Sequence, residues 1–297
     1  MRRICLALYL ASVLGTANAQ DADLGPTLKR IASEGTIQLG YREAAVPFSY
    51  VLADKQTPAG FSWELCGRVV NAVKERLGKE IKVVPVVATS TARLMMVKVG
   101  MADIECGATT NTVSRQSQAA FSNTFFVSEV KVMVRADSGI KSFADLVGKK
   151  ILTTNGTSAD RLVKMTAIRL SQAVLEVTGR SHEESMAMLV RGDADAYVAD
   201  DAILLGKRAG AANPEDYVLL PEGLSVEPYG LALPKDDPVF KKLVDDVLVG
   251  LMKSGEFETI YNKWFMEPIP PNGVRLNLPM TPALKALVQN PNDTPAN

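Results

Sequence analysis

Strand-like and helix-like stretches alternate along this chain, and the alternation occurs in two successive blocks. The first block has strand-like runs at residues 36–40, 81–87 and 103–106 and helical patterns at 62–77 and 92–99. In the longer helical pattern an apolar residue recurs every four positions from Leu65 to Leu77, and Gly78 follows as a stop signal. A β-α-β-α-β order predicts a parallel sheet with helices on both faces.

The second block repeats this order after a long extended stretch at 125–135. It has strand-like runs at 151–154, 174–177 and 194–198, with helical patterns at 158–170, 181–191 and 201–209. Ser158 is a candidate cap for the first of these helices, and Ser181 with Glu184 fits a capping box. The end of the chain has an extended run at 229–233, helical patterns at 238–253 and 256–265, and a Pro- and Asn-rich tail expected to wrap the surface. The helix at 238–253 is expected to bury Leu243, Val247 and Leu251.

Two successive α/β blocks predict an α/β protein with two lobes. We expect the first lobe to comprise residues 23–127 and 230–297 and the second lobe residues 131–226, joined by two extended crossings near 127–131 and 225–229. Ligands of open α/β sheets bind beyond the carboxyl ends of the strands. The expected site is therefore a cleft between the lobes, which would close by hinge motion on a ligand.

The first nineteen residues have the pattern of a secretory signal peptide. Arg2 and Arg3 precede an apolar run, which ends in small residues up to Ala19. The run is shorter than the roughly 20 residues that span a bilayer, and no later run is longer, so we expect a soluble mature protein outside the cytoplasm. The alternative is a short N-terminal helix of the folded domain. Removal of residues 1–19 leaves a slight excess of acids and no basic stripe, so nucleic acid is not an expected partner.

Cysteine and histidine are scarce in this chain. Cys5 leaves with the signal, and Cys66 and Cys106 remain either as one disulfide or as two separately buried thiols. The chain has one histidine and no pair of cysteines at metal-binding spacing, so neither a metal nor another cofactor is expected.

Polar and charged residues follow the predicted strands. They are three arginines, several hydroxyls, a histidine that opens a helix, and one acid: Arg42, Ser90, Arg93, Thr110, Arg115, Thr157, Ser158, His182 and Asp200. None has the spacing of a catalytic triad or a phosphate loop. Each has a simpler interpretation: arginines are common on surfaces, residues 156–158 can be a helix start, His182 can be solvated, and Asp200 can be only a helix cap.

This set of residue types fits an amino-acid ligand. An arginine can hold a carboxylate with a two-pronged, charge-assisted bond, and a helix start offers further N–H groups. An acid must receive the ammonium, because a closing cleft strips water from every charge. One arginine and one aspartate satisfy any amino-acid backbone. The surplus arginines indicate a second anionic group on the ligand, which predicts glutamate or aspartate.

The chain resembles the periplasmic glutamate/aspartate-binding proteins of ABC importers, within the family 3 solute-binding group. The matching stretches are residues 40–43, 46–50, 105–112, 115, 119–122, 200–202, 229–230 and 263–265. The block at 105–111 (ECGATTN) is specific to the acidic-amino-acid branch, and the resemblance extends over residues 25–297. It implies a type II periplasmic-binding-protein fold, a periplasmic location, delivery of ligand to the membrane permease subunits of an ABC importer, and a monomer.

The resemblance also implies a role for each site residue. Arg115 and Thr110 would hold the α-carboxylate with help from Thr157 and Ser158, and Asp200 would receive the ammonium. The side-chain carboxylate would lie against Arg42, Ser90, Arg93 and His182. Ala108 departs from the family pattern, which usually has a serine there, so we expect weaker binding or altered preference. A bridge between Cys66 and Cys106 occurs in parts of this branch.

Three other functions compete with this interpretation. A few proteins of the same architecture are dehydratases acting on a cyclic amino-acid precursor, but an enzyme needs a positioned acid, and the candidates here are mostly cations and hydroxyls. A sensory module usually has an anchor or a fused domain, which the sequence does not show. A binder of neutral or basic amino acids is disfavoured by Arg42 and Arg93, which would repel a cation.

Overall fold

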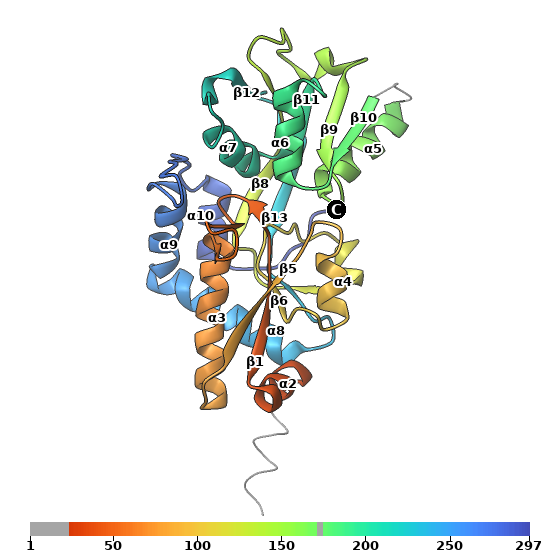
Figure 1. The fold of residues 1–297 in the computed structure, drawn as a ribbon. Coiled ribbons are helices and arrows are strands. Elements are labelled where there is room, and N and C mark those ends of the chain that lie inside the picture. The colour runs from red at the N-terminus through yellow and green to blue at the C-terminus, as the bar shows by residue number, and fades with distance from the viewer. Residues whose placement is uncertain (1–23, 171–174) are drawn as a thin grey trace, which may run out of the picture.

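The computed structural model describes residues 24–170 and 175–297. The predicted signal peptide at 1–19 lies outside these residues, as does Val174 at the start of one predicted strand. The described chain forms two lobes, each built on a sheet with helices packed on it, as the sequence predicts (Figure 1). Within the described ranges, no helix combines the length and the apolar character needed to cross a membrane.

The lower lobe in Figure 1 contains a five-stranded sheet whose strands lie in the order β5-β1-β6-β14-β7. Its elements are α2 (Pro26–Glu34), β1 (Thr36–Tyr41), α3 (Phe61–Leu77), β5 (Lys82–Val87), α4 (Arg93–Lys98), β6 (Ile104–Glu105), β7 (Ala120–Phe121) and β14 (Ala232–Leu233). β1 is parallel to both β5 and β6, which confirms the predicted β-α-β-α-β order. Leu65, Val69 and Val73 of α3 are fully buried, each contributing about 1.5–3 kcal/mol by leaving water.

The upper lobe repeats this arrangement. Its elements are β9 (Lys150–Thr154), α5 (Ser158–Leu170), β10 (Leu175–Gly179), α6 (His182–Arg191), β11 (Ala196–Asp200), α7 (Asp201–Ala209) and β12 (Tyr217–Leu219). β9 lies between β10 and β11 and is parallel to both, as β1 is to β5 and β6. In both lobes, therefore, the first strand of the block lies between the other two.

Two long strands form the predicted crossings between the lobes. β8 (Phe126–Arg135) pairs antiparallel with β13 (Ser225–Tyr229), in a register that places Phe126 opposite Tyr229 and Val130 opposite Ser225. The far half of β8 then pairs with β11 and β12 of the upper lobe. Both strands run between the lobes in Figure 1.

Aromatic rings anchor the lower end of these crossings. Phe126 stacks on Phe265 with ring centroids 5.2 Å apart, and Phe48 meets Tyr229 edge-on at 5.1 Å. Such pairs add about 0.5–1.5 kcal/mol each to the area that they bury. The strands that connect the lobes therefore begin and end in the lower core.

Several features differ from the sequence prediction or were not predicted. The remaining elements are β2 (Ala44–Ala45), β3 (Ser49–Val51), β4 (Pro58–Ala59), α8 (Pro238–Ser254), α9 (Glu256–Phe265), α10 (Pro282–Gln289) and the 3₁₀ turns Arg115–Ser117, Phe143–Leu146 and Pro214–Asp216. The small β2-β3-β4 sheet and α10, which lies within the tail, were not predicted. The tail end runs beside the lower lobe, where Thr112 bridges Ala296.

Three local predictions need correction. α8 buries the predicted Leu251, but its other fully buried residues are Phe240, Val244 and Leu248, while Leu243 and Val247 are only partly buried against the same core. Thr157, not Ser158, caps α5: its Oγ1 accepts a hydrogen bond from Asp160 N at 3.1 Å. The capping box is half formed, because the Glu184 carboxylate accepts from Arg180 N and not from the N-cap residue.

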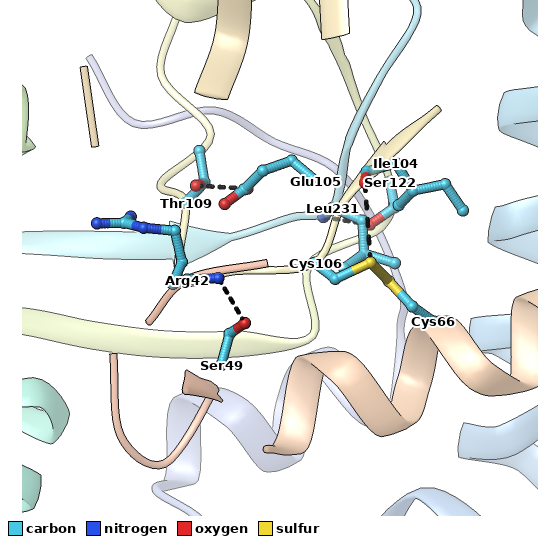
Figure 2. Close-up of a disulfide and its surroundings, with 9 residues drawn as sticks. All are labelled: Arg42, Ser49, Cys66, Ile104, Glu105, Cys106, Thr109, Ser122 and Leu231. Carbon is cyan, nitrogen blue, oxygen red and sulfur yellow. Dashed lines mark hydrogen bonds between the residues drawn. A yellow bond between two sulfur atoms is a disulfide. The ribbon is translucent and has the colours of Figure 1, made fainter. Parts of the chain in front are cut away.

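Cys66 and Cys106 form a disulfide that joins α3 to the end of β6. Figure 2 shows Glu105, the residue before Cys106, with its carboxylate on the side of the Arg42 side chain and away from the sulfur atoms. Successive residues of a strand point to opposite faces. The bridge thus fixes the strand end from which Glu105 extends toward the arginines.

The mature protein is expected to show no free thiol when it is labelled under denaturing, non-reducing conditions. Closure of a loop with a sequence separation of 40 contributes about 4 kcal/mol in the chain-entropy picture. Urea unfolding with and without reductant should show a loss of that order and the appearance of two thiols. Thiols that react before reduction would contradict the bridge.

Candidate functional site

A small cavity lies between the two lobes. Ten residues line it: Arg42, Arg93, Ala108, Thr110, Thr157, Ser158, His182, Ala199, Asp200 and Ile203. Eight of these belong to the predicted site, and they come from both lobes. The two other predicted residues, Ser90 and Arg115, contact lining residues directly. Each predicted residue follows the carboxyl end of a strand or occupies it, as open α/β sheets favour.

Arg42 and Arg93 form one end of the cavity with Ser90. Arg42 Nη2 donates to Ser90 Oγ, and Arg93 Nη1 donates to Ser90 O at 2.8 Å. The two arginines are 6% and 2% exposed, so both guanidinium groups are withdrawn from water. Arg93 Nε is buried and has no hydrogen-bond partner in the described chain. This end of the cavity therefore holds positive charge and an unused donor.

Burial makes these charges costly. Burial and, to a smaller extent, the neighbouring Arg93 charge together lower the pKa of Arg42 to about 10. Burial also lowers the pKa of Arg93, while the Glu105 carboxylate opposes that change. Glu105 is fully buried, and its Oε2 accepts from Thr109 Oγ1 at 2.7 Å, as Figure 2 shows. Glu105 is therefore a counter-charge beneath the arginines, and the sequence analysis assigned it no role.

Arg115 and Thr110 form a second donor group that faces the upper lobe. Arg115 Nη1 donates to Thr110 O at 3.0 Å, and Nη2 donates to Gly156 O at 3.4 Å. Thr110 Oγ1 lies 3.3 Å from Ser158 Oγ. Burial lowers the pKa of Arg115 to about 10, with a further contribution from Arg93. These contacts bring a lower-lobe arginine to the start of α5.

Asp200 ends β11 and is the acid of the cavity. It occupies the N-cap position of α7 but makes no side-chain cap bond, so the capping interpretation is wrong. Its Oδ2 accepts from the Tyr229 hydroxyl. Burial raises the pKa of Asp200 to about 8, and the charge of Glu227 adds to the effect. Tyr229 and Glu227 of β13 were not assigned to the site from the sequence, and both connect it to a crossing strand.

His182 opens α6 and is 6% exposed, so the interpretation as a solvated residue is wrong. Its Nδ1 lies 2.8 Å from the Tyr197 hydroxyl and 3.1 Å from Thr154 Oγ1. Burial lowers the pKa of His182 well below its ordinary value, and Arg42 lowers it further. The imidazole is therefore neutral at physiological pH, with Nε2 as the ring nitrogen left for a ligand.

Three apolar residues complete the lining. Ala199 and Ile203 are almost fully buried on either side of Asp200, and Ala108 lies in the lower lobe. The only sequence signal for them is their closeness to Asp200: Ala199 comes directly before it, and Ile203 follows three residues later. They narrow the cavity without adding polar groups.

A larger groove of about 890 Å³ lies outside this cavity, between α6, α7 and residues 269–274. It is lined by three cations and three acids, and each cation forms an ion pair: Lys207 with Glu183 at 2.5 Å, Arg135 with Asp137 at 2.8 Å, and Arg191 with Asp193 at 2.7 Å. The groove therefore has no surplus charge for a small ionic ligand. Among the residues that the structure describes, no cluster of three or more His, Cys, Asp or Glu side chains is arranged to hold a metal ion.

The chain is similar to known solute-binding proteins. Residues 37–267 match the model of the bacterial extracellular solute-binding proteins, family 3. The chain is 40% identical to an L-glutamate/L-aspartate-binding protein of Pseudomonas aeruginosa, covering 98% of this chain and 97% of the relative. It is 39% identical to a glutamate/aspartate import solute-binding protein of Escherichia coli, with the same coverage.

A solved structure shares the fold. An ancestral amino acid-binding protein, described as a precursor of cyclohexadienyl dehydratase, superimposes with a TM-score of 0.69 at 25% identity. The match covers 80% of this chain and 99% of that one.

The buried carboxyl group of Asp200 predicts a pH dependence of stability. The ligand-free folded protein keeps this proton up to about pH 8, whereas the unfolded chain releases it near the ordinary value of 3.8. The folded state binds more protons in that range, so the free energy of unfolding should fall between about pH 4 and pH 8. Asp200→Asn should reduce this fall.

Urea unfolding at pH 5 and pH 8 measures the effect in the wild type and in Asp200→Asn. His182 contributes with the opposite sign, because its pKa is lowered in the folded state, but it is present in both proteins and cancels in the comparison. An equal pH effect in the two proteins would contradict the assignment to Asp200.

Proposed function

Because this chain belongs to the bacterial extracellular solute-binding proteins of family 3, we propose that it captures glutamate or aspartate between its lobes and delivers the amino acid to an ABC importer. The named relatives bind or import these two amino acids. The observation that carries the proposal is the gathering of three arginines at one cavity, with Arg42 and Arg93 buried and Arg115 half-buried. An amino acid with one carboxylate would leave part of this charge unpaired.

The α-carboxylate of the ligand is assigned to Arg115 and Thr110. The guanidinium fork matches a carboxylate, and the hydroxyls of Thr110 and Ser158 lie 3.3 Å apart beside it. The start of α5 at Thr157 and Ser158 adds the partial positive charge of a helix N-terminus. This group joins both lobes, so it supports closure whichever side chain the ligand has.

The ammonium of the ligand is assigned to Asp200. In the ligand-free cavity this carboxyl group is buried and keeps its proton to about pH 8. A neighbouring ammonium favours the ionised form, so binding should release this proton near neutral pH. Tyr229 fixes the carboxylate by donating to Oδ2.

The side-chain carboxylate is assigned to Arg42, Ser90, Arg93 and His182. Arg93 Nε is an unused buried donor, which is costly until an acceptor arrives. When Tyr197 donates to Nδ1 of the neutral His182, Nε2 carries the ring proton and donates to the ligand. Ala108 contributes no hydroxyl, so only its backbone carbonyl can assist the ammonium.

The wider assignment follows from the same proposal. We propose a mature protein that starts after residue 19, works in the periplasm as a monomer, and contacts the permease subunits of its importer. Its lobes are residues 23–127 with 230–297, and residues 131–226. A binding role without turnover is favoured over a dehydratase, because guanidinium groups hold anions but do not exchange protons at neutral pH.

Arg93→Ala should abolish the preference for glutamate over glutamine. The charge-assisted bonds that it removes are worth about 1.5–3 kcal/mol each, so glutamate affinity should fall by roughly ten- to a hundredfold while glutamine affinity changes little. Isothermal titration calorimetry of the wild type against all twenty amino acids sets the reference. Arg180→Ala is the matched control, because that side chain is 91% exposed. Unchanged selectivity in Arg93→Ala would contradict the side-chain site.

Arg115→Ala should remove measurable binding of every amino acid, because each ligand presents an α-carboxylate. Arg115→Lys keeps the charge but loses the fork, so it should bind more weakly with the same ranking of ligands. Calorimetry of both variants at high protein concentration tests this. Wild-type affinity in Arg115→Ala would reject the α-carboxylate assignment.

A further inference from the structure

Two glycines of the upper lobe touch the backbone of the lower lobe. A Cβ atom on Gly206 of α7 would lie 2.5 Å from Val46 O and 3.1 Å from Val46 C. A Cβ atom on Gly156, before α5, would lie 2.8 Å from Thr91 Cγ2 and 3.0 Å from Thr91 Cα. Real Cβ atoms essentially never approach other atoms below 3.0 Å. At both contacts, therefore, a residue larger than glycine would force the neighbouring backbone of the other lobe to move.

These contacts flank the candidate ligand cavity. Gly156 immediately precedes Thr157 and Ser158, which line the cavity, and its carbonyl accepts from Arg115. Gly206 lies one turn after Ile203, which lines it on the other helix. α5 and α7 both belong to the upper lobe in Figure 1, and the loop before α4 belongs to the lower lobe. The distance between the lobes is thus fixed at two points beside the site.

Helical glycines elsewhere in the chain lack this constraint. Gly67 of α3 and Gly250 of α8 have no atom within 4 Å of a built Cβ. Gly206 is also a costly choice for its helix, since glycine is a poor helix former. Packing against the other lobe is a physical reason for its presence.

We propose that Gly156 and Gly206 are positioning residues that set how closely the lobes approach in the closed state. A side chain at either position keeps the lobes apart and weakens every ligand without changing the order of preference. The inference rests on the proposed function, because it concerns closure around the bound amino acid.

The physical reason is the reach of the donors. At Gly206 the separation from Val46 must grow from 2.5 Å to at least 3.4 Å, where ordinary contact begins. The ligand's partners come from both lobes, and charge-assisted hydrogen bonds are effective near 2.7–2.9 Å. An added gap of that size lengthens bonds to one lobe or the other. It acts on the α-carboxylate and ammonium contacts that all amino acids share.

Gly206→Ala is the sharper test, because Gly156 has a φ of 77° and any side chain there is strained for a second reason. Gly250→Ala is the matched control: the same change inside a helix, without the contact. Calorimetry with glutamate and aspartate gives affinities, and small-angle X-ray scattering gives the radius of gyration with and without saturating ligand. Thermal unfolding without ligand reports on the fold.

For Gly206→Ala we expect at least a tenfold loss of affinity for both amino acids by the same factor, with incomplete compaction on saturation. Its ligand-free melting temperature should be equal to or above that of the wild type, because alanine favours the helix. Gly250→Ala should keep wild-type affinity and compaction. Wild-type affinity and compaction in Gly206→Ala would overturn this inference and leave the proposed function standing. A wild type that binds none of the twenty amino acids would overturn the proposed function and the inference with it.

Discussion

The crowding of three guanidinium groups at one site, two of them buried and one half-buried, is the constraint on which the rest of this structure depends. Burial disfavours the charged form of Arg42, Arg93 and Arg115. In Arg42 and Arg115 the charge of a neighbouring arginine disfavours it further. Carboxylates buried nearby, Glu105 and Glu227, offset part of this cost, and each leaves one oxygen without a partner in the described residues. A buried charge needs a partner. In the proposed function, an acidic amino acid supplies the partner that these charges lack.

The architecture delivers these charges to one place by a simple rule. β1 and β9 each lie between two parallel neighbours. The loops that follow these parallel strands carry the polar residues to the carboxyl ends of both sheets. The crossing strand β13 adds a direct link, because Tyr229 packs among the aromatic rings of the lower core and donates to Asp200 of the upper lobe. The crossing strand and Asp200, the acid proposed to bind the ligand, are therefore directly linked.

Much of this was predictable from the sequence, and the failures have physical reasons. The alternation of apolar runs predicted β1, α3, β9 and α7 because burial imposes the periods of strand and helix. In α8 the apolar residues repeat with the helical period on two adjacent faces, so the sequence alone could not show which face is buried. Packing against the neighbouring core buries Phe240 more deeply than Leu243. The strands β2 to β4 are too short to show a period. Glu105 was missed because a strand end gave no sign that its carboxylate would lie beneath arginines.

The sheet of each lobe includes one strand from a segment that has just crossed over from the other lobe. β8 enters the upper sheet antiparallel to β11, and β14 enters the lower sheet antiparallel to β6. Residues 126–229 hold every strand of the upper sheet, whereas the lower sheet needs residues on both sides of that segment. During synthesis the N-terminal half therefore emerges without β14, α8 and α9. The upper lobe can form before the lower one is complete, and Phe48 and Phe61 lack their contacts with Phe265 and Phe257 until the last quarter of the polypeptide is made.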